Sequence, residues 1–142
     1  AASGPPILLV DTIGELGAWW GTATIGFVGG SLFSSRGGQN MIEPAAYGVA
    51  TCFGPNTQNF RDVVDLLLSN QAAVRVTTSA ELTAFVRRCL EQPGFTAELG
   101  HNAVQTVLSQ QGAVHVTLAH LKTLISKPAT FDTVGDQRHA AA

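Results

Sequence analysis

The sequence predicts an α/β fold with a doubly wound, Rossmann-like parallel sheet. Short apolar runs alternate with segments of helical periodicity, a pattern typical of parallel strands covered by helices. A stretch with four glycines joins one of these runs to a helix, and doubly wound sheets bind their ligands at such places. The 142 residues are enough for one domain with a core and too few for two.

Four apolar runs are predicted to be strands: residues 7–10, 25–28, 49–53 and 73–76. Each is mostly apolar on both faces, as a strand buried between two helical layers must be. We therefore expect a parallel sheet with helices on both sides.

Helices are predicted where a start signal precedes an apolar stripe. Thr78 and Glu81 fit a capping box ahead of a helix whose apolar face includes Cys89. Asn59 is placed to cap a helix with an apolar stripe made of Phe60, Val63, Val64 and Leu67. These signals predict one helix after each of the last two strands.

The C-terminal part of the chain is predicted to be helical as far as residue 125. Pro93 opens a helix, Gly112 ends it, and the apolar period then resumes up to Ile125. From Lys127 onward the period is lost. We expect one domain over residues 1–126 and an irregular tail over residues 127–142.

The composition argues against several classes of protein. Eight Lys and Arg against ten Asp and Glu give a net charge of −2, which does not suit a nucleic-acid-binding protein. No apolar stretch approaches the roughly 20 residues of a membrane span, and the first residues do not resemble a signal peptide, so the cytosol is the expected compartment. Because 45% of the residues are hydrophobic and only 13% are charged, we expect part of the surface to be covered by a partner.

The cysteines and histidines do not form a metal-binding or catalytic pattern. Cys52 and Cys89 fall in a predicted strand and on a helix face, so we expect buried free thiols, with a disulfide or a reactive thiol as alternatives. The four histidines, at positions 101, 115, 120 and 139, are expected to be surface or packing residues. The sequence predicts no metal and no cofactor, and it does not support hydrolase chemistry.

The glycine-rich stretch over residues 29–40 is a candidate phosphate site. Glycine pairs at positions 29–30 and 37–38 allow close approach of a ligand to the backbone N–H groups. Arg36 adds a planar charged group suited to a phosphate or a sugar carboxylate. A flexible surface loop without a ligand is the alternative.

Asn40 and Glu43 stand at the entrance of the helix that follows this loop. Pro44 lacks an N–H and fits only the first turn of a helix, which places Glu43 at the helix start. A carboxylate there can accept hydrogen bonds from the two hydroxyls of a ribose. The alternative is a capping box between Asn40 and Glu43, and the two roles are compatible.

A second candidate segment follows the first predicted strand. It runs from Asp11 to Leu16, and its Gly14 allows a base or a phosphate to come close, while Glu15 suits the first turn of a helix. A plain turn between a strand and a helix is the alternative.

The ordered motifs DTIGEL, FVGGSL, RGGQNMIEPAAYG and FGPNTQNFRD resemble the C-terminal half of the 3-deoxy-D-manno-octulosonic acid (Kdo) transferases, a family of two-domain GT-B glycosyltransferases. The resemblance runs from about Ile7 to Val76, with all four motifs in family order and spacing. It implies an inverting transfer of Kdo from CMP-Kdo to a lipid A precursor, in lipopolysaccharide biosynthesis at the cytoplasmic face of the bacterial inner membrane.

The resemblance implies that residues 1–126 are a partial C-terminal nucleotide-sugar-binding domain, and it also implies the substrate site. The CMP part is expected to contact Ile13, Gly14, Glu15, Asn40, Met41, Ile42 and Glu43. The substrate site also includes Gly30, Ser31, Arg36, Gly37 and Gly38, with Arg36 and the glycines beside it bordering the phosphate and Kdo. One departure is Gln39, where the family usually has a histidine; a glutamine still donates and accepts hydrogen bonds.

The family's N-terminal acceptor domain, with the catalytic carboxylate and the membrane-associating surface, is not in this sequence. We therefore expect the chain alone to be inactive. In the family, two further strands lie between those at residues 7–10 and 25–28, so the chain is expected to rearrange its sheet, self-associate or leave an edge open. Another GT-B transferase or epimerase using a UDP-sugar, or a non-catalytic nucleotide-binding module, are the alternative functions.

Overall fold

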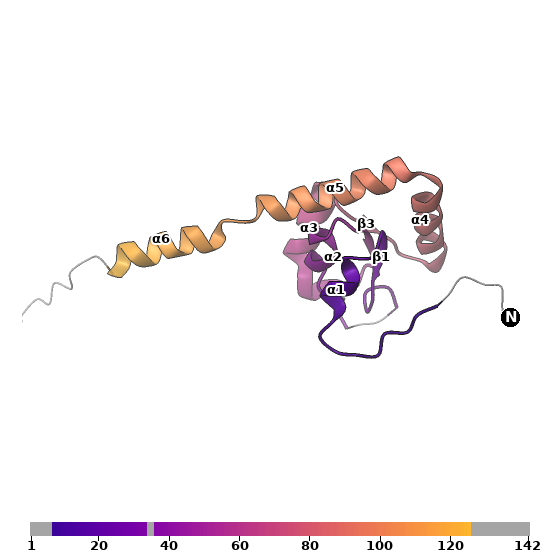
Figure 1. The fold of residues 1–142 in the computed structure, drawn as a ribbon, viewed down its shortest axis with the longest axis horizontal. Coiled ribbons are helices and arrows are strands. Elements are labelled where there is room, and N and C mark those ends of the chain that lie inside the picture. Colours follow the sequence, from indigo (N-terminus) through magenta and orange to yellow (C-terminus); the bar gives the residue numbers. More distant parts are fainter. Residues whose placement is uncertain (1–6, 34–35, 126–142) are drawn as a thin grey trace, which may run out of the picture. The chain divides into compact units, whose positions relative to one another are not determined.

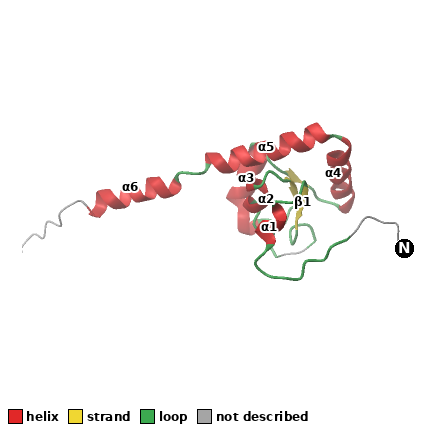
Figure 2. Ribbon diagram, viewed as in Figure 1, coloured by secondary structure: helices red, strands yellow, loops and turns green. Residues whose placement is uncertain are grey.

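The computed structural model describes residues 7–33 and 36–125 of the chain. Contacts within the chain divide it into two units, residues 1–110 and residues 111–142. Among their described residues, the first unit contains a three-stranded sheet and five α-helices, and the second contains one helix (Figures 1 and 2).

The sheet is parallel, with its strands in the order β1 (Ile25–Val28), β2 (Ala50–Phe53) and β3 (Val74–Arg75). Cys52 of β2 pairs with Phe27 on one side and with Val74 on the other. Three of the four predicted strands and their parallel arrangement are thereby confirmed. Strands β2 and β3 are each slightly shorter than the predicted runs at residues 49–53 and 73–76.

The prediction of a strand over residues 7–10 is wrong. These residues form no strand, and their side chains are exposed, Ile7 to 96% and Leu9 to 84%. A strand is stable only when a neighbouring strand binds its backbone N–H and C=O groups, and among the described residues no strand lies beside this segment.

The helices of the first unit follow the predicted order. They are α1 (Leu16–Trp20), α2 (Ile42–Ala46), the short 3-10 helix η1 (Gln58–Phe60), α3 (Arg61–Ser69), α4 (Ser79–Glu91) and α5 (Pro93–Ser109). At the start of α4, the Thr78 hydroxyl accepts a hydrogen bond from the Glu81 N–H at 3.1 Å, which confirms the predicted cap. Asn59 does not cap α3: it lies inside η1 and its side chain bonds elsewhere.

Two hydrophobic clusters cover the sheet. One joins Val28 and Phe53 to side chains of α2, α3 and α5: Met41, Ala45, Val64, Leu67 and Ala103. The other joins Cys52 and Val76 to side chains of α4 and α5: Phe85, Cys89 and Leu99. The sheet is therefore buried on both faces, as the apolar strands require.

Helix α5 contributes to both clusters, through Ala103 to one and Leu99 to the other. It also touches the backbone of the turn before β2, since a Cβ atom on Gly100 would overlap the carbonyl oxygen of Gly48. Glycine is needed at position 100 because the two backbones are in contact.

Both cysteines are buried free thiols, as predicted. Burial, with the nearby Cys89, raises the pKa of the Cys52 thiol to about 12, and burial also raises the pKa of Cys89. His101 and His120 are exposed, as expected of surface histidines, and His139 lies outside the described residues.

The described part of the second unit is helix α6 (Ala113–Ile125), preceded by Gly112 with a φ of +129°. Its large apolar side chains, such as Leu121 and Ile125, are exposed. Among the described residues, no helix is both long enough and apolar enough to cross a membrane. The predicted tail over residues 127–142 lies outside the described residues, and the domain boundary stays a prediction.

Candidate functional site

The loops after β1 and β2 start at the same edge of the sheet because the two strands are parallel. Ser31 ties them together, although it is completely buried. Its hydroxyl donates to the Val28 carbonyl and accepts from the Gly54 N–H at 2.8 Å. The Asn56 N–H donates to the Ser31 carbonyl at 2.8 Å, and the Asn56 side chain donates to the Leu32 carbonyl at 3.2 Å.

The glycine-rich loop folds back on itself at Gly30 and Gly38. The Gly38 N–H donates to the Gly30 carbonyl at 3.2 Å, and both glycines have positive φ, +81° and +71°. A Cβ atom on Gly38 would lie 3.0 Å from the Met41 methyl carbon and 3.3 Å from the Asn56 carbonyl oxygen. Position 38 therefore requires glycine for both its conformation and its space.

Arg36 and Gly37 are held against the loop that follows β2. The Asn59 side chain donates to the Arg36 carbonyl at 3.0 Å, and a Cβ on Gly37, whose φ is +86°, would overlap the Asn59 amide. The Arg36 side chain is exposed. The loop therefore presents its arginine to solvent while its backbone is fixed.

Asn40 and Glu43 form a hydrogen-bonded pair at the start of α2. The Asn40 side-chain oxygen accepts from the Ile42 N–H at 3.1 Å, and its NH₂ group donates to the Glu43 carboxylate at 3.0 Å. Glu43 is half-buried and Met41 is fully buried in the core. Asn40 thus binds the first N–H group of α2 through its side chain and orients the Glu43 carboxylate, although the N-cap position itself is Met41.

Residues 12–15 form a separate turn before α1. The Thr12 hydroxyl donates to the Glu15 carboxylate at 2.8 Å, Gly14 has a φ of +100°, and Ile13 is fully exposed. Helix α1 contacts α2, with Tyr47 lying next to Gly17 and Gly21. Residues 12–15 and the pair of Asn40 and Glu43 therefore lie at the starts of two helices, α1 and α2, that are in contact with each other.

The predicted residues thus fall into four groups. Hydrogen bonds and close packing join Gly30, Ser31, Gly38 and Met41, whereas Asn59 holds Arg36 and Gly37. The third group is Asn40 with Ile42 and Glu43, to which Asn40 is hydrogen-bonded. The fourth group, over residues 12–15, forms its side-chain hydrogen bond within itself. The described residues contain no group of three or more His, Cys, Asp or Glu side chains that could hold a metal ion.

Sequence reasoning did not anticipate the structural roles of Gly54, Asn56 and Asn59. All three lie in the motif FGPNTQNFRD, in which the sequence predicted only a helix cap at Asn59. The two asparagines and the glycine of this motif were the available signal of such contacts. Loops that follow neighbouring parallel strands lie side by side, and these residue types can bind or pack against a neighbouring backbone.

Comparison with known proteins identifies several transferases of the same name as relatives. The chain is 32% identical over 127 residues to the 3-deoxy-D-manno-octulosonic acid transferase of Bordetella pertussis, covering 86% of this chain and 29% of that protein. The enzyme of the same name from Haemophilus influenzae is 30% identical over 122 residues, which are 85% of this chain and 28% of that protein. No family model matches the chain.

Among solved structures, the crystal structure of the C-terminal CMP-Kdo binding domain of WaaA from Acinetobacter baumannii is similar, with a TM-score of 0.65 and 32% identity. The match covers 69% of this chain and 51% of that domain. The chain therefore has the fold of the C-terminal domain of a GT-B glycosyltransferase. Within that class it belongs to the 3-deoxy-D-manno-octulosonic acid transferase family, and it spans less than a third of the length of these curated relatives.

Proposed function

We propose that the chain is the donor-binding part of a transferase that moves Kdo from CMP-Kdo to a lipid A precursor. The similarity to a CMP-Kdo binding domain supports the donor, and the names of the curated relatives support the transfer. The observation that carries the proposal is the hydrogen-bonded pair of Asn40 and Glu43, which stands just after a glycine-rich loop at the ligand-binding edge of the sheet.

Each part of the site then has a defined task. The Glu43 carboxylate accepts hydrogen bonds from the ribose hydroxyls of CMP, and Asn40 holds it in position. The Gly38 N–H is bonded to Gly30, so in this proposal the phosphate approaches other backbone N–H groups of the glycine-rich loop. The exposed guanidinium of Arg36 neutralises the phosphate or the Kdo carboxylate. Ile13, Gly14, Glu15 and Ile42 complete the nucleotide side.

Three predicted site residues serve as supports in this proposal. Ser31 and Met41 are fully buried, so their side chains position the loop instead of touching the ligand. Gly30 accepts the hydrogen bond that closes the loop.

The intact transferase, acting at the cytoplasmic face of the inner membrane, would take its acceptor and its catalytic base from another domain. That base removes the proton of the acceptor hydroxyl, while the part described here stabilises CMP as it leaves. We therefore expect this chain alone to bind the donor without transferring Kdo. Membrane contact is assigned to the acceptor domain.

Titration of the chain with CMP, UMP and UDP tests the proposal by calorimetry. We expect CMP to bind and UMP and UDP to bind at least about tenfold more weakly, a difference of about 1.4 kcal/mol. Preferential binding of a uridine nucleotide would instead indicate a UDP-sugar enzyme. If none of the three binds, the nucleotide site is absent.

A non-catalytic nucleotide-binding module is the second candidate, favoured by the exposed Gln39 at the position of the family's usual histidine. Joining the chain to an acceptor domain of a Kdo transferase and measuring transfer separates the two. Transfer by the fusion supports the enzyme, and CMP binding without transfer supports the module. A Gln39→His fusion shows whether the glutamine alone is responsible.

A further inference from the structure

A groove runs along the outer edge of β3. It consists of two cavities of about 330 and about 300 Å³ that share Val74, Arg88 and Phe95. The first continues to Gln71 and Ala73, before the strand, and the second continues to Arg75 and Val76. The groove therefore follows the direction of β3 from its amino end to its carboxyl end.

The backbone at this edge can accept another strand. In a parallel strand, the N–H and C=O groups of successive residues point alternately to the two sides. The Val76 N–H donates to the Phe53 carbonyl of β2 at 2.9 Å, so Arg75, one residue earlier, points its N–H and C=O groups outward. At the opposite edge of the sheet, the Ala50 N–H donates to the Thr24 carbonyl, so Thr24 points toward β2. By the same alternation, the N–H and C=O groups of Ile25 and Phe27 point outward.

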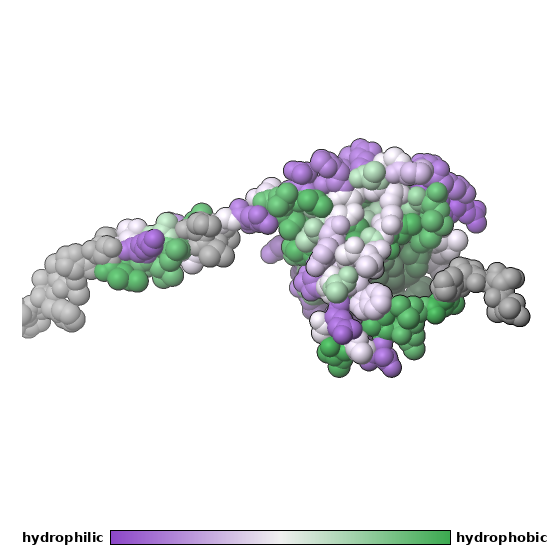
Figure 3. All heavy atoms as spheres, viewed as in Figure 1, coloured by the Kyte–Doolittle hydropathy of each residue, from purple (hydrophilic) through white to green (hydrophobic). Residues whose placement is uncertain are grey.

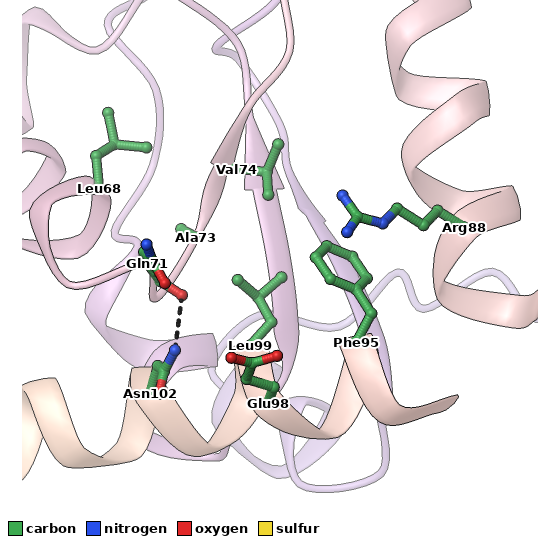
Figure 4. A pocket seen from close by; sticks show the side chains of 9 residues that line it. All are labelled: Leu68, Gln71, Ala73, Val74, Arg88, Phe95, Glu98, Leu99 and Asn102. Atoms are coloured by element: carbon green, nitrogen blue, oxygen red, sulfur yellow. Dashed lines mark hydrogen bonds between the residues drawn. The ribbon is translucent and has the colours of Figure 1, made fainter. Parts of the chain in front are cut away.

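The walls of the groove come from both layers of the fold. Figure 4 shows Leu68, from the α3 side of the sheet, and Leu99 and Phe95, from the α5 side, around the same cavity. The Arg88 guanidinium lies over the Phe95 ring at 3.6 Å from its centre, and Asn102 bonds to the Gln71 carbonyl. An apolar strand placed here would thus be covered on both faces along the first cavity, and by side chains of α4 and α5 along the second.

The same chain carries a segment that matches these requirements. Residues 7–10, Ile-Leu-Leu-Val, have the composition of a strand buried on both faces, and yet they are exposed. Green apolar atoms mark this N-terminal segment in Figure 3, below the sheet in the view of Figure 1. Exposed apolar surface of this kind indicates an interaction site.

We propose that the groove along β3 binds residues 7–10 of a second copy of this chain as an added parallel strand. The charges favour this occupant and this direction. Asp11 follows the segment directly, and in a parallel arrangement it would leave the groove at the carboxyl end of β3. Arg75 and Glu81 line only that end, Glu98 lines only the other end, and Arg88 lines both cavities. The charged side chains at the carboxyl end therefore have a net positive charge, whereas those at the amino end balance.

Sedimentation of the chain over a range of concentrations tests the apolar part of the contact. The double variant Leu8→Lys/Leu9→Lys changes side chains that are 69% and 84% exposed, so the monomer still folds. We expect concentration-dependent association in the parent chain and a monomer in this variant. The control Leu124→Lys, on the exposed face of α6, is expected to associate like the parent. Association lost in the control but kept in the double variant would assign the contact to α6 and overturn the proposal, as would a parent chain that stays monomeric.

Charge reversal tests the groove itself. Arg75 and Arg88 are exposed, so Arg75→Glu/Arg88→Glu is expected to fold and to weaken association at least about tenfold. Arg87→Glu, the neighbouring exposed arginine outside the groove, is the matched control and is expected to have no effect. Equal weakening by Arg87→Glu would show a nonspecific charge effect and would contradict the proposal.

Amide hydrogen exchange identifies the edge that is used. We expect the Arg75 N–H to become protected as concentration rises, whereas the N–H groups of Ile25 and Phe27 are unchanged. Protection of Ile25 and Phe27 instead would place the added strand on β1. Protection of Arg75 that does not depend on concentration would show that the segment occupies the groove of its own chain. Either result overturns the contact between copies.

Discussion

The Gly54 N–H donates to the Ser31 hydroxyl at 2.8 Å, and this bond joins the loops after β1 and β2. The backbones are so close that a Cβ atom on Gly54 would overlap the Ser31 carbonyl oxygen and the backbone of Leu32. The proposed phosphate loop therefore depends on a glycine 23 residues further along the chain.

Gly54→Ala is expected to lower the free energy of unfolding by about 2–3 kcal/mol, because backbone atoms cannot yield as a flexible side chain can. Urea unfolding measures the loss. The control is Gly94→Ala, in the first turn of α5, where a Cβ atom meets nothing within 4 Å. Alanine there should leave the stability unchanged or raise it by up to about 1 kcal/mol. Equal stability of the two variants would contradict the packing described for the two loops.

Glu43→Gln is expected to weaken CMP binding about tenfold or more, because hydrogen bonds to a charged acceptor contribute about 1.5–3 kcal/mol. If the carboxylate binds the ribose hydroxyls, the variant should also discriminate less between CMP and 2′-deoxy-CMP. Calorimetric titration with both nucleotides measures each effect. Glu91→Gln, an exposed carboxylate on α4, is the control. A uniform loss with unchanged discrimination would remove Glu43 from the ribose site.

The start of α4 should respond to acid through Glu81. Hydrogen bonds from the N–H and hydroxyl of Thr77 lower the pKa of this carboxyl group. A lowered pKa in the folded state means that the carboxylate stabilises the fold at neutral pH and that this contribution is lost as the pH falls through the folded-state pKa. Unfolding measured between about pH 6 and pH 3 should therefore depend less on pH in Glu81→Gln than in Glu91→Gln. Identical dependence of stability on pH in the two variants would contradict the stabilising role assigned to the Glu81 carboxylate.

The two thiols should be unreactive in the folded chain. Because burial raises the pKa of Cys52 to about 12 and also raises that of Cys89, little thiolate exists at pH 8. A colorimetric thiol reagent should react only slowly with the native chain. After unfolding in urea, the same reagent should react with both thiols. Fewer than two would indicate a disulfide. Since the folded-state pKa values are raised, stability should decline as the pH rises above about 8.5, the pKa of an unfolded thiol.

Much of the fold could be predicted because local and tertiary preferences agree. The apolar runs of β1, β2 and β3 pair with one another, and the Thr78 cap and Pro93 mark helix starts that need no distant partner. Residues 7–10 were predicted wrongly because a strand depends on its neighbour, which the pattern of a single segment does not reveal.

The site was predicted less completely than the fold. The local pair of Asn40 and Glu43 follows from its spacing in the sequence, and the structure shows it as a hydrogen bond. The roles of Ser31 and Asn59 rest on hydrogen bonds between loops more than 20 residues apart, which spacing alone does not reveal. Asn59 looked like a helix cap because asparagine is equally suited to both tasks.

Helix α5 gives the first unit a further property. Leu99 and Ala103 stand four residues apart on α5 and belong to different hydrophobic clusters, while Gly100 between them touches Gly48 before β2. Detaching α5 would expose both faces of the sheet at once, so neither layer has a separate route to unfolding. We expect the first unit to lose its structure in one cooperative transition, with amides of β2 exchanging only through global opening.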